Sequence, residues 1–159
     1  MKIYMNDLMK SRYETAYEIP LKIKNFIKRE IKRAIAKSQR INDDIGERIV
    51  LYEVCKRTDI FPKFANMTCY EYACNELWWP ASELLYQQEH CIHILLDALT
   101  FELKRKYPNR AFGVYVSVQE GEEGYIQAWF HLYRTDDPPM LSSQLENYKK
   151  PVLFMIIET

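Results

Sequence analysis

The feature that most constrains the fold is a change in hydrophobic period near residue 110. Before it, long segments carry apolar residues three and four positions apart, the spacing of a helix with one buried face. From Phe112 onward, apolar Phe112, Val114, Val116 and Val118 alternate with less apolar neighbours. Such alternation places successive side chains on opposite faces of a strand. Helices first and strands last predict an α+β fold.

The clearest helix is predicted over residues 21–37. At about 100° per residue, its apolar side holds Ile23, Phe26, Ile27, Ile31 and Ala34. Pro20 suits the start of this helix, because a first-turn N–H would have no partner there.

Three further helices are predicted between residues 42 and 107. One starts at Asn42 or Asp43 as N-cap and runs through residue 57. The next opens with a capping box, Thr68 to Glu71, and ends at Pro80. The longest covers residues 81–107, where leucine and isoleucine recur at helical spacing. Together these segments predict a helical N-terminal half.

The strands are predicted at 112–119, 125–133 and 151–157, with 2–5 as a short fourth strand. The first two form a hairpin around the loop EGEEG, and 134–150 is a loop with one short helical turn. The segment PVLFMII is apolar on both faces, so it should lie between the hairpin and another element. The helical half is thus expected to pack on a small, mainly antiparallel sheet of three to four strands.

Composition predicts one intracellular domain over residues 1–159. The chain is 48% hydrophobic, has 4 Gly and shows no linker-like stretch between apolar regions. It lacks a signal-peptide pattern and any apolar run near the roughly 18 residues of a membrane span. Its 4 Cys include no C-x-x-C pair, so reduced thiols and a cytoplasmic location are expected.

Charge is unevenly distributed although the net charge is zero. Residues 1–40 hold eleven Lys/Arg against four Asp/Glu, and residues 41–159 hold eleven against eighteen. The basic side of helix 21–37 consists of Lys22, Lys28, Arg29, Lys32 and Arg33. Such a face can bind nucleic-acid phosphates, an anionic membrane or an acidic partner. A solvated face balanced by the acidic remainder is favoured, and nucleic-acid binding comes next.

The segment QQEHCIHILLD, residues 87–97, raises the question of a metal site. On a helix His90, His93 and Asp97 fall on the polar face and Cys91 on the apolar one. The inverse zincin motif fails, because Tyr86 stands three residues before Glu89. A solvated helix face is favoured, and a metal-dependent enzyme using His90, His93 and Asp97 is kept as an alternative.

Two other sets of residues are candidates for partner binding. One is an aromatic sheet face, formed by Tyr115, Tyr125, Trp129, His131 and Tyr133. The other comprises acidic loops, formed by Glu120, Glu122, Glu123, Asp136 and Asp137. Aromatic residues dominate interface hot spots, and acidic loops attract basic partners. The aromatic face could instead be covered by a helix or form a homodimer interface.

Catalytic motifs are missing from the sequence, which contains no G-x-S-x-G, P-loop or dinucleotide fingerprint. No cofactor is therefore expected. The interpretation favoured by these observations is a non-enzymatic binding protein that acts through contact with another protein, as an inhibitor, immunity factor or adaptor. The nucleic-acid-binding and metal-dependent alternatives stay open.

Overall fold

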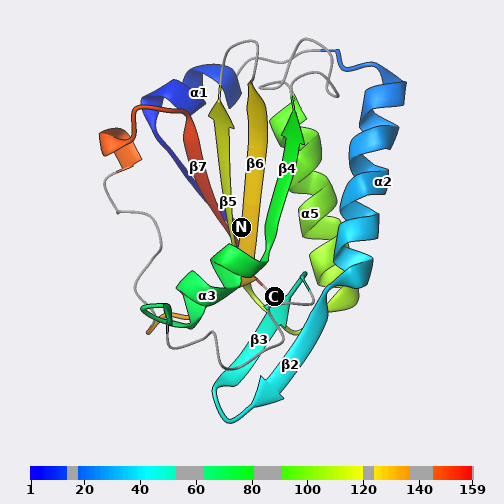
Figure 1. The fold of residues 1–159 in the computed structure, drawn as a ribbon. Coiled ribbons are helices and arrows are strands. Elements are labelled where there is room, and N and C mark those ends of the chain that lie inside the picture. The colour runs from blue at the N-terminus through cyan, green and yellow to red at the C-terminus, as the bar shows by residue number, and fades with distance from the viewer. Residues whose placement is uncertain (14–17, 53–62, 81–90, 120–123, 137–144, 159) are drawn as a thin grey trace.

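The fold is built on an open antiparallel sheet with helices on both faces (Figure 1). The computed structural model describes residues 1–13, 18–52, 63–80, 91–119, 124–136 and 145–158. Within these ranges five strands form one sheet in the order β1-β7-β5-β6-β4, and β2 pairs with β3 in a separate hairpin. The predicted α+β class is confirmed.

Helices and strands are interspersed along the chain. In order they are β1 (Lys2–Met5), α1 (Asp7–Tyr13), α2 (Leu21–Lys37), β2 (Gln39–Asp43), β3 (Gly46–Val50), α3 (Met67–Cys74), β4 (Glu76–Pro80), α5 (Ile92–Lys106), β5 (Phe112–Gln119), β6 (Tyr125–Leu132), the 3-10 turn η4 (Leu145–Asn147) and β7 (Val152–Ile157). Strands are therefore spread along the chain, and the expected division into a helical half and a sheet half holds only in part.

The strongly periodic segments fold as predicted. Helix α2 covers residues 21–37, with Ile27, Ile31 and Ile35 at most 2% exposed. Strands β5 and β6 form the expected hairpin pair, and β7 lies between β5 and β1. In each case the hydrophobic period predicts which side chains face the core.

The helix predicted from residue 42 is wrong, because residues 39–50 form the β2–β3 hairpin. Asp43 pairs with Gly46 across a two-residue turn, and Gly46 adopts φ 111°, which a residue with a side chain rarely adopts. Arg48 fastens this turn by donating to both carboxylate oxygens of Asp43, at 2.6 and 2.9 Å. The predicted residues 53–57 lie outside the described ranges.

The helix predicted from Thr68 to Pro80 is also wrong in its cap and its length. Asn66 is the N-cap, and its side chain accepts from the Cys69 N–H at 2.8 Å, so the predicted capping box does not form. The helix ends at Cys74, and residues 76–80 form β4 as an additional, fifth strand. The expectation of reduced thiols fails for Cys74, which is disulfide-bonded.

Helices α2 and α5 pack side by side on one face of the sheet, the core face (Figure 1). Leu77, Val114, Phe130 and Met155 are among the buried residues that the strands contribute to this layer. Helix α3 packs on the opposite face against β6, and this face is called the α3 face. Of the predicted helix 81–107, residues 81–90 lie outside the described ranges. None of the helices described here is long and apolar enough to cross a membrane.

Candidate functional site

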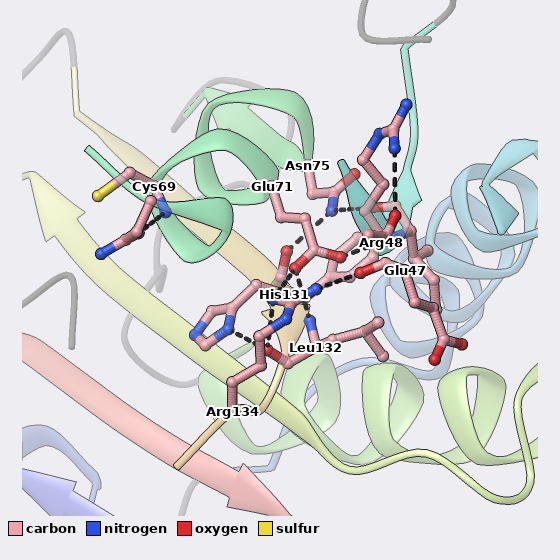
Figure 2. Close-up of polar contacts among 12 residues, drawn as sticks. Glu47, Arg48, Cys69, Glu71, Asn75, His131, Leu132 and Arg134 are labelled. Atoms are coloured by element: carbon pink, nitrogen blue, oxygen red, sulfur yellow. Dashed lines mark hydrogen bonds and ion pairs between the residues drawn. The ribbon is translucent and has the colours of Figure 1, made fainter. Parts of the chain in front are cut away.

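A buried polar junction, formed by Glu71, Asn75 and Arg134, joins the hairpin to the main sheet (Figure 2). Glu71 is 0% exposed. One of its carboxylate oxygens accepts from the Ile49 N–H at 2.6 Å. The other accepts from the Leu132 N–H at 3.1 Å and from the Arg134 guanidinium at 2.6 Å.

Asn75 lies four residues after Glu71 and extends the same connection. Its amide donates to the Ile49 carbonyl at 2.7 Å and to the Phe130 carbonyl at 3.0 Å, and its oxygen accepts from the Leu51 N–H at 2.7 Å. The side chains of Glu71 and Asn75 therefore bond backbone groups of residues 49–51 and of β6, which belong to different sheets. An unsatisfied buried backbone group is costly, so this connection fixes the relative position of the two sheets.

The protonation of Glu71 is shifted by its surroundings. Burial raises the pKa of Glu71 to about 7, against the opposing effect of Arg134 and the two backbone N–H groups. A carboxyl group that titrates near neutrality has the pKa that a general acid or base requires. Glu71 is completely buried, however, and both its oxygens already accept hydrogen bonds. The geometry therefore indicates that the junction has a structural role in the fold.

The predicted aromatic sheet face is largely buried within the fold. Tyr115, Trp129 and His131 are 1%, 8% and 3% exposed. Tyr72 of α3 stacks on Trp129 with ring centroids 4.9 Å apart, which accounts for part of the covering. Of the remaining two predicted residues, Tyr125 is half-buried and Tyr133 is 37% exposed. A partner could reach only the margin of this face.

An accessible aromatic surface does exist at the edge strand β4, and we call it the β4 surface. Its members are Tyr52, Glu76, Trp78, Tyr125 and Gln127. Trp78 is 52% exposed, and its ring lies 5.9 Å from that of Tyr125.

Two hydrogen bonds order the β4 surface. The Tyr52 hydroxyl donates to the Glu76 carbonyl at 2.8 Å, and the Gln127 amide donates to the Glu76 carboxylate at 2.7 Å. The sequence prediction missed this surface because residues 76–79 were assigned to a helix. The alternation of Leu77 and Trp79 with Glu76 and Trp78 was the available signal.

The proposed metal ligands are only partly described. His93 and Asp97 are exposed on α5, and His90 lies outside the described ranges. The Nε2 atom of His93 is 2.6 Å from the Tyr13 carbonyl oxygen, and the centroids of the His93 and Tyr13 rings are 3.9 Å apart. Among the residues the structure describes, no three His, Cys, Asp or Glu side chains are grouped to hold a metal ion.

The charged candidates are divided between described and undescribed parts of the chain. Asp136 is exposed, whereas Glu120, Glu122, Glu123 and Asp137 lie outside the described ranges. The basic residues of α2, Lys22, Lys28, Arg29, Lys32 and Arg33, are all exposed. The structure thus presents the basic helix face to solvent and leaves the acidic loops largely undescribed.

Comparison with known proteins adds no assignment, since no family model, curated protein or solved structure matches the chain.

Proposed function

We propose that this protein acts by binding another protein, through the β4 surface, and without catalysing a reaction. The observation that carries the proposal is Trp78, whose large apolar side chain is 52% exposed on an edge strand. Edge strands usually carry charged residues or prolines that discourage association. Strand β4 has such residues at its ends, Glu76 and Pro80, but an exposed tryptophan at its middle is typical of an interface anchor.

The surroundings of Trp78 support this role. Tyr125 lies against its ring, and the bonds of Glu76 to Tyr52 and Gln127 order the polar groups around it. Ordered side chains lose little conformational entropy on binding, which favours affinity. Tyrosine and tryptophan also combine a large contact area with a polar group that tolerates solvent in the unbound state. An inhibitor, an immunity factor or an adaptor would each use a surface of this kind.

The test is a pull-down from the native host with tagged protein, washed at low and high salt after nuclease treatment of the lysate. Trp78→Ala is compared with Phe101→Ala, because Phe101 is 65% exposed on α5 and offers a matched loss of exposed aromatic surface elsewhere. We expect a protein that resists nuclease and high salt, and that is lost with Trp78→Ala alone.

Affinity for the recovered protein then gives the quantitative test. Hot-spot tryptophans contribute about 2 kcal/mol or more, so Trp78→Ala should weaken binding at least about 30-fold. Equal retention by the two variants would show that the contact lies elsewhere and would refute the assignment to the β4 surface.

A further inference from the structure

The outer face of α2 remains unexplained by the proposed protein contact. Leu77 and Trp79 point into the core shared with α2 and α5, so Trp78 faces the other side of the sheet. The basic residues of α2 therefore belong to a separate surface. We call it the basic face, and it consists of Lys22, Lys28, Arg29, Lys32 and Arg33.

Ion pairs within the described ranges neutralise only part of this face. Glu30 pairs with Arg29 at 3.2 Å and with Arg33 at 3.0 Å. Lys22, Lys28 and Lys32 have no ion pair within the part of the chain that the structure describes. The five cations of the basic face thus share one carboxylate on α2, that of Glu30.

Several acidic residues in the described ranges pair with cations outside the basic face. Ion pairs in the described ranges join Asp43 to Arg48, Glu47 to Arg40 and Arg110, Glu71 to Arg134, Glu102 to Arg105, and Glu158 to Lys2 and the N-terminus. None of these pairs includes Lys22, Lys28 or Lys32.

A cavity lined by three cationic residues lies next to the C-terminal end of α2. Its volume is about 180 Å³, and it is lined by Arg40, Lys106, Tyr107, Pro108, Asn109 and Arg110. The Lys106 ammonium binds the carbonyls of Ile35 and Ala36 at 2.8 and 2.9 Å, which fixes the cavity to the end of α2. Arg40 and Arg110 share the single carboxylate of Glu47, at 2.6 and 2.7 Å. The two arginines thus leave one positive charge unneutralised at the cavity, whereas the Lys106 ammonium is occupied by the carbonyls at the end of α2.

We propose that the basic face and this cavity bind the phosphate backbone of a nucleic acid without reading its sequence. A helix of 17 residues is about 25 Å long, and its cations are distributed along most of that length. A polymer with regularly spaced phosphates matches such an extended row of cations. Lysine ammonium groups contact phosphates as point charges, without the geometric demands of base recognition.

The burial of α2 argues against the membrane as the anionic partner. An amphipathic helix binds a bilayer by inserting its apolar side. Here that side includes Ile27, Ile31 and Ile35, which are 0–2% exposed and packed in the core. The helix would have to leave the fold before it could insert.

The experiment measures binding of a fluorescent DNA duplex of about 20 base pairs by anisotropy at several salt concentrations. If the five cations of the basic face each contact a phosphate, log K should fall with log salt with a slope of about −4.5, and contacts at the cavity would make the slope steeper. Affinity should then drop roughly 500-fold between about 50 and 200 mM salt. No binding at the lower salt concentration would overturn the proposal.

Two matched variants locate the contact. The test variant replaces Lys22, Lys28 and Lys32 with Gln, and the control variant replaces Lys2, Lys63 and Lys149, which are also exposed. Both changes remove the same charge. We expect the test variant to reduce the slope by about 2.7 and to weaken binding at least tenfold, with a much smaller effect of the control. Equal effects would overturn the proposal.

Two further probes separate nucleic acid from other anions. Polyglutamate of similar length is used as a competitor, and vesicles containing phosphatidylserine are used in co-sedimentation at the same salt concentration. The duplex should bind more tightly than either probe. Equal or tighter binding of polyglutamate or of vesicles would overturn the assignment to nucleic acid.

Discussion

Replacement of Glu71 by alanine should be the most damaging single change to the polar junction. The substitution removes both acceptors that serve the Ile49 and Leu132 N–H groups. It also deprives Arg134 of its carboxylate partner, although that side chain keeps 19% exposure and a bond to the Glu47 carbonyl at 2.6 Å. The change therefore leaves two backbone donors without partners and one guanidinium unneutralised.

The expected loss follows from the burial of the pair. Removing one partner of a buried ion pair costs about 3–5 kcal/mol, because the remaining charge lacks compensation. The partial exposure of Arg134 lets water reach it, which favours the lower end of that range. We expect the free energy of unfolding to fall by about 3 kcal/mol, and the Tm to fall by roughly 6–12 °C.

The assay is urea unfolding at about pH 8, where a Glu71 pKa of about 7 leaves the carboxylate mostly ionised, with Glu30→Ala as the matched control. Glu30 also pairs with two arginines, but it lies on the surface with 31% side-chain exposure. Exposed ion pairs contribute about 1 kcal/mol or less, so the control should change stability little. A similar loss for both variants, or a loss below about 1 kcal/mol for Glu71→Ala, would refute the role assigned to the buried junction.

Three further changes test other parts of the structure. Burial raises the pKa of Glu71 from 4.5 to about 7, so the folded state holds this proton more tightly than the unfolded state. The resulting contribution to the free energy of unfolding is complete below pH 4.5 and is lost as pH rises through 7. Glu71→Gln should flatten this part of the profile in urea titrations at about pH 5 and about pH 8, and an unchanged slope would contradict the assignment. Gly113→Ala would place Cβ 2.3 Å from Nε2 of the buried His131, so about 1–3 kcal/mol should be lost in the same assay. At Gly46 the nearest atom would be 3.6 Å away, so Gly46→Ala tests the strain of φ 111° alone and should lower the free energy of unfolding by about 1–3 kcal/mol. Wild-type stability in either glycine variant would show that its backbone adjusts without strain.

The elements that sequence analysis predicted correctly are those whose local pattern agrees with their tertiary surroundings. Helix α2 has a proline before its first turn and a continuous apolar stripe, and both features act within the helix. Strands β5 and β6 alternate strictly, so pairing them in register buries one complete apolar face. No distant residue is needed to explain these elements.

The elements that were missed have different causes, because α3 is positioned by distant partners and the β2–β3 hairpin by a local contact. Glu71 resembles the last residue of a capping box, yet it bonds the backbone of Ile49 and Leu132, which are 22 and 61 positions away. The β2–β3 hairpin contains no Asn-Gly or Asp-Gly turn, and its turn is fastened by the Asp43–Arg48 pair. The Glu71 contacts have no local indication in the sequence because they form only after the chain has folded, whereas the Asp43–Arg48 pair spans five positions and is a local feature that the helix prediction did not take into account.

Contacts between distant residues also determine why the aromatic face is covered and the β4 surface is accessible. The alternation of Tyr125, Trp129 and His131 correctly placed them on one face of β6, but their exposure depended on what packs over them. Helix α3 reaches this face because the side chains of Glu71 and Asn75 bond the backbone of β6, and Tyr72 then covers Trp129. The buried junction thus removes one aromatic surface from contact, while the Trp78 side chain remains exposed at the edge.

The two proposed contacts should be energetically independent, because the sheet and its core separate them. Trp78 lies on the α3 face, and the lysines of α2 lie beyond the helices that pack on the core face. Changes at distant sites without shared partners usually add within about 0.5 kcal/mol. Trp78→Ala should therefore leave duplex affinity and its salt slope unchanged, and the three lysine changes should leave the protein partner's affinity at high salt unchanged. A loss of both activities in either variant would show instead that one continuous surface serves both partners.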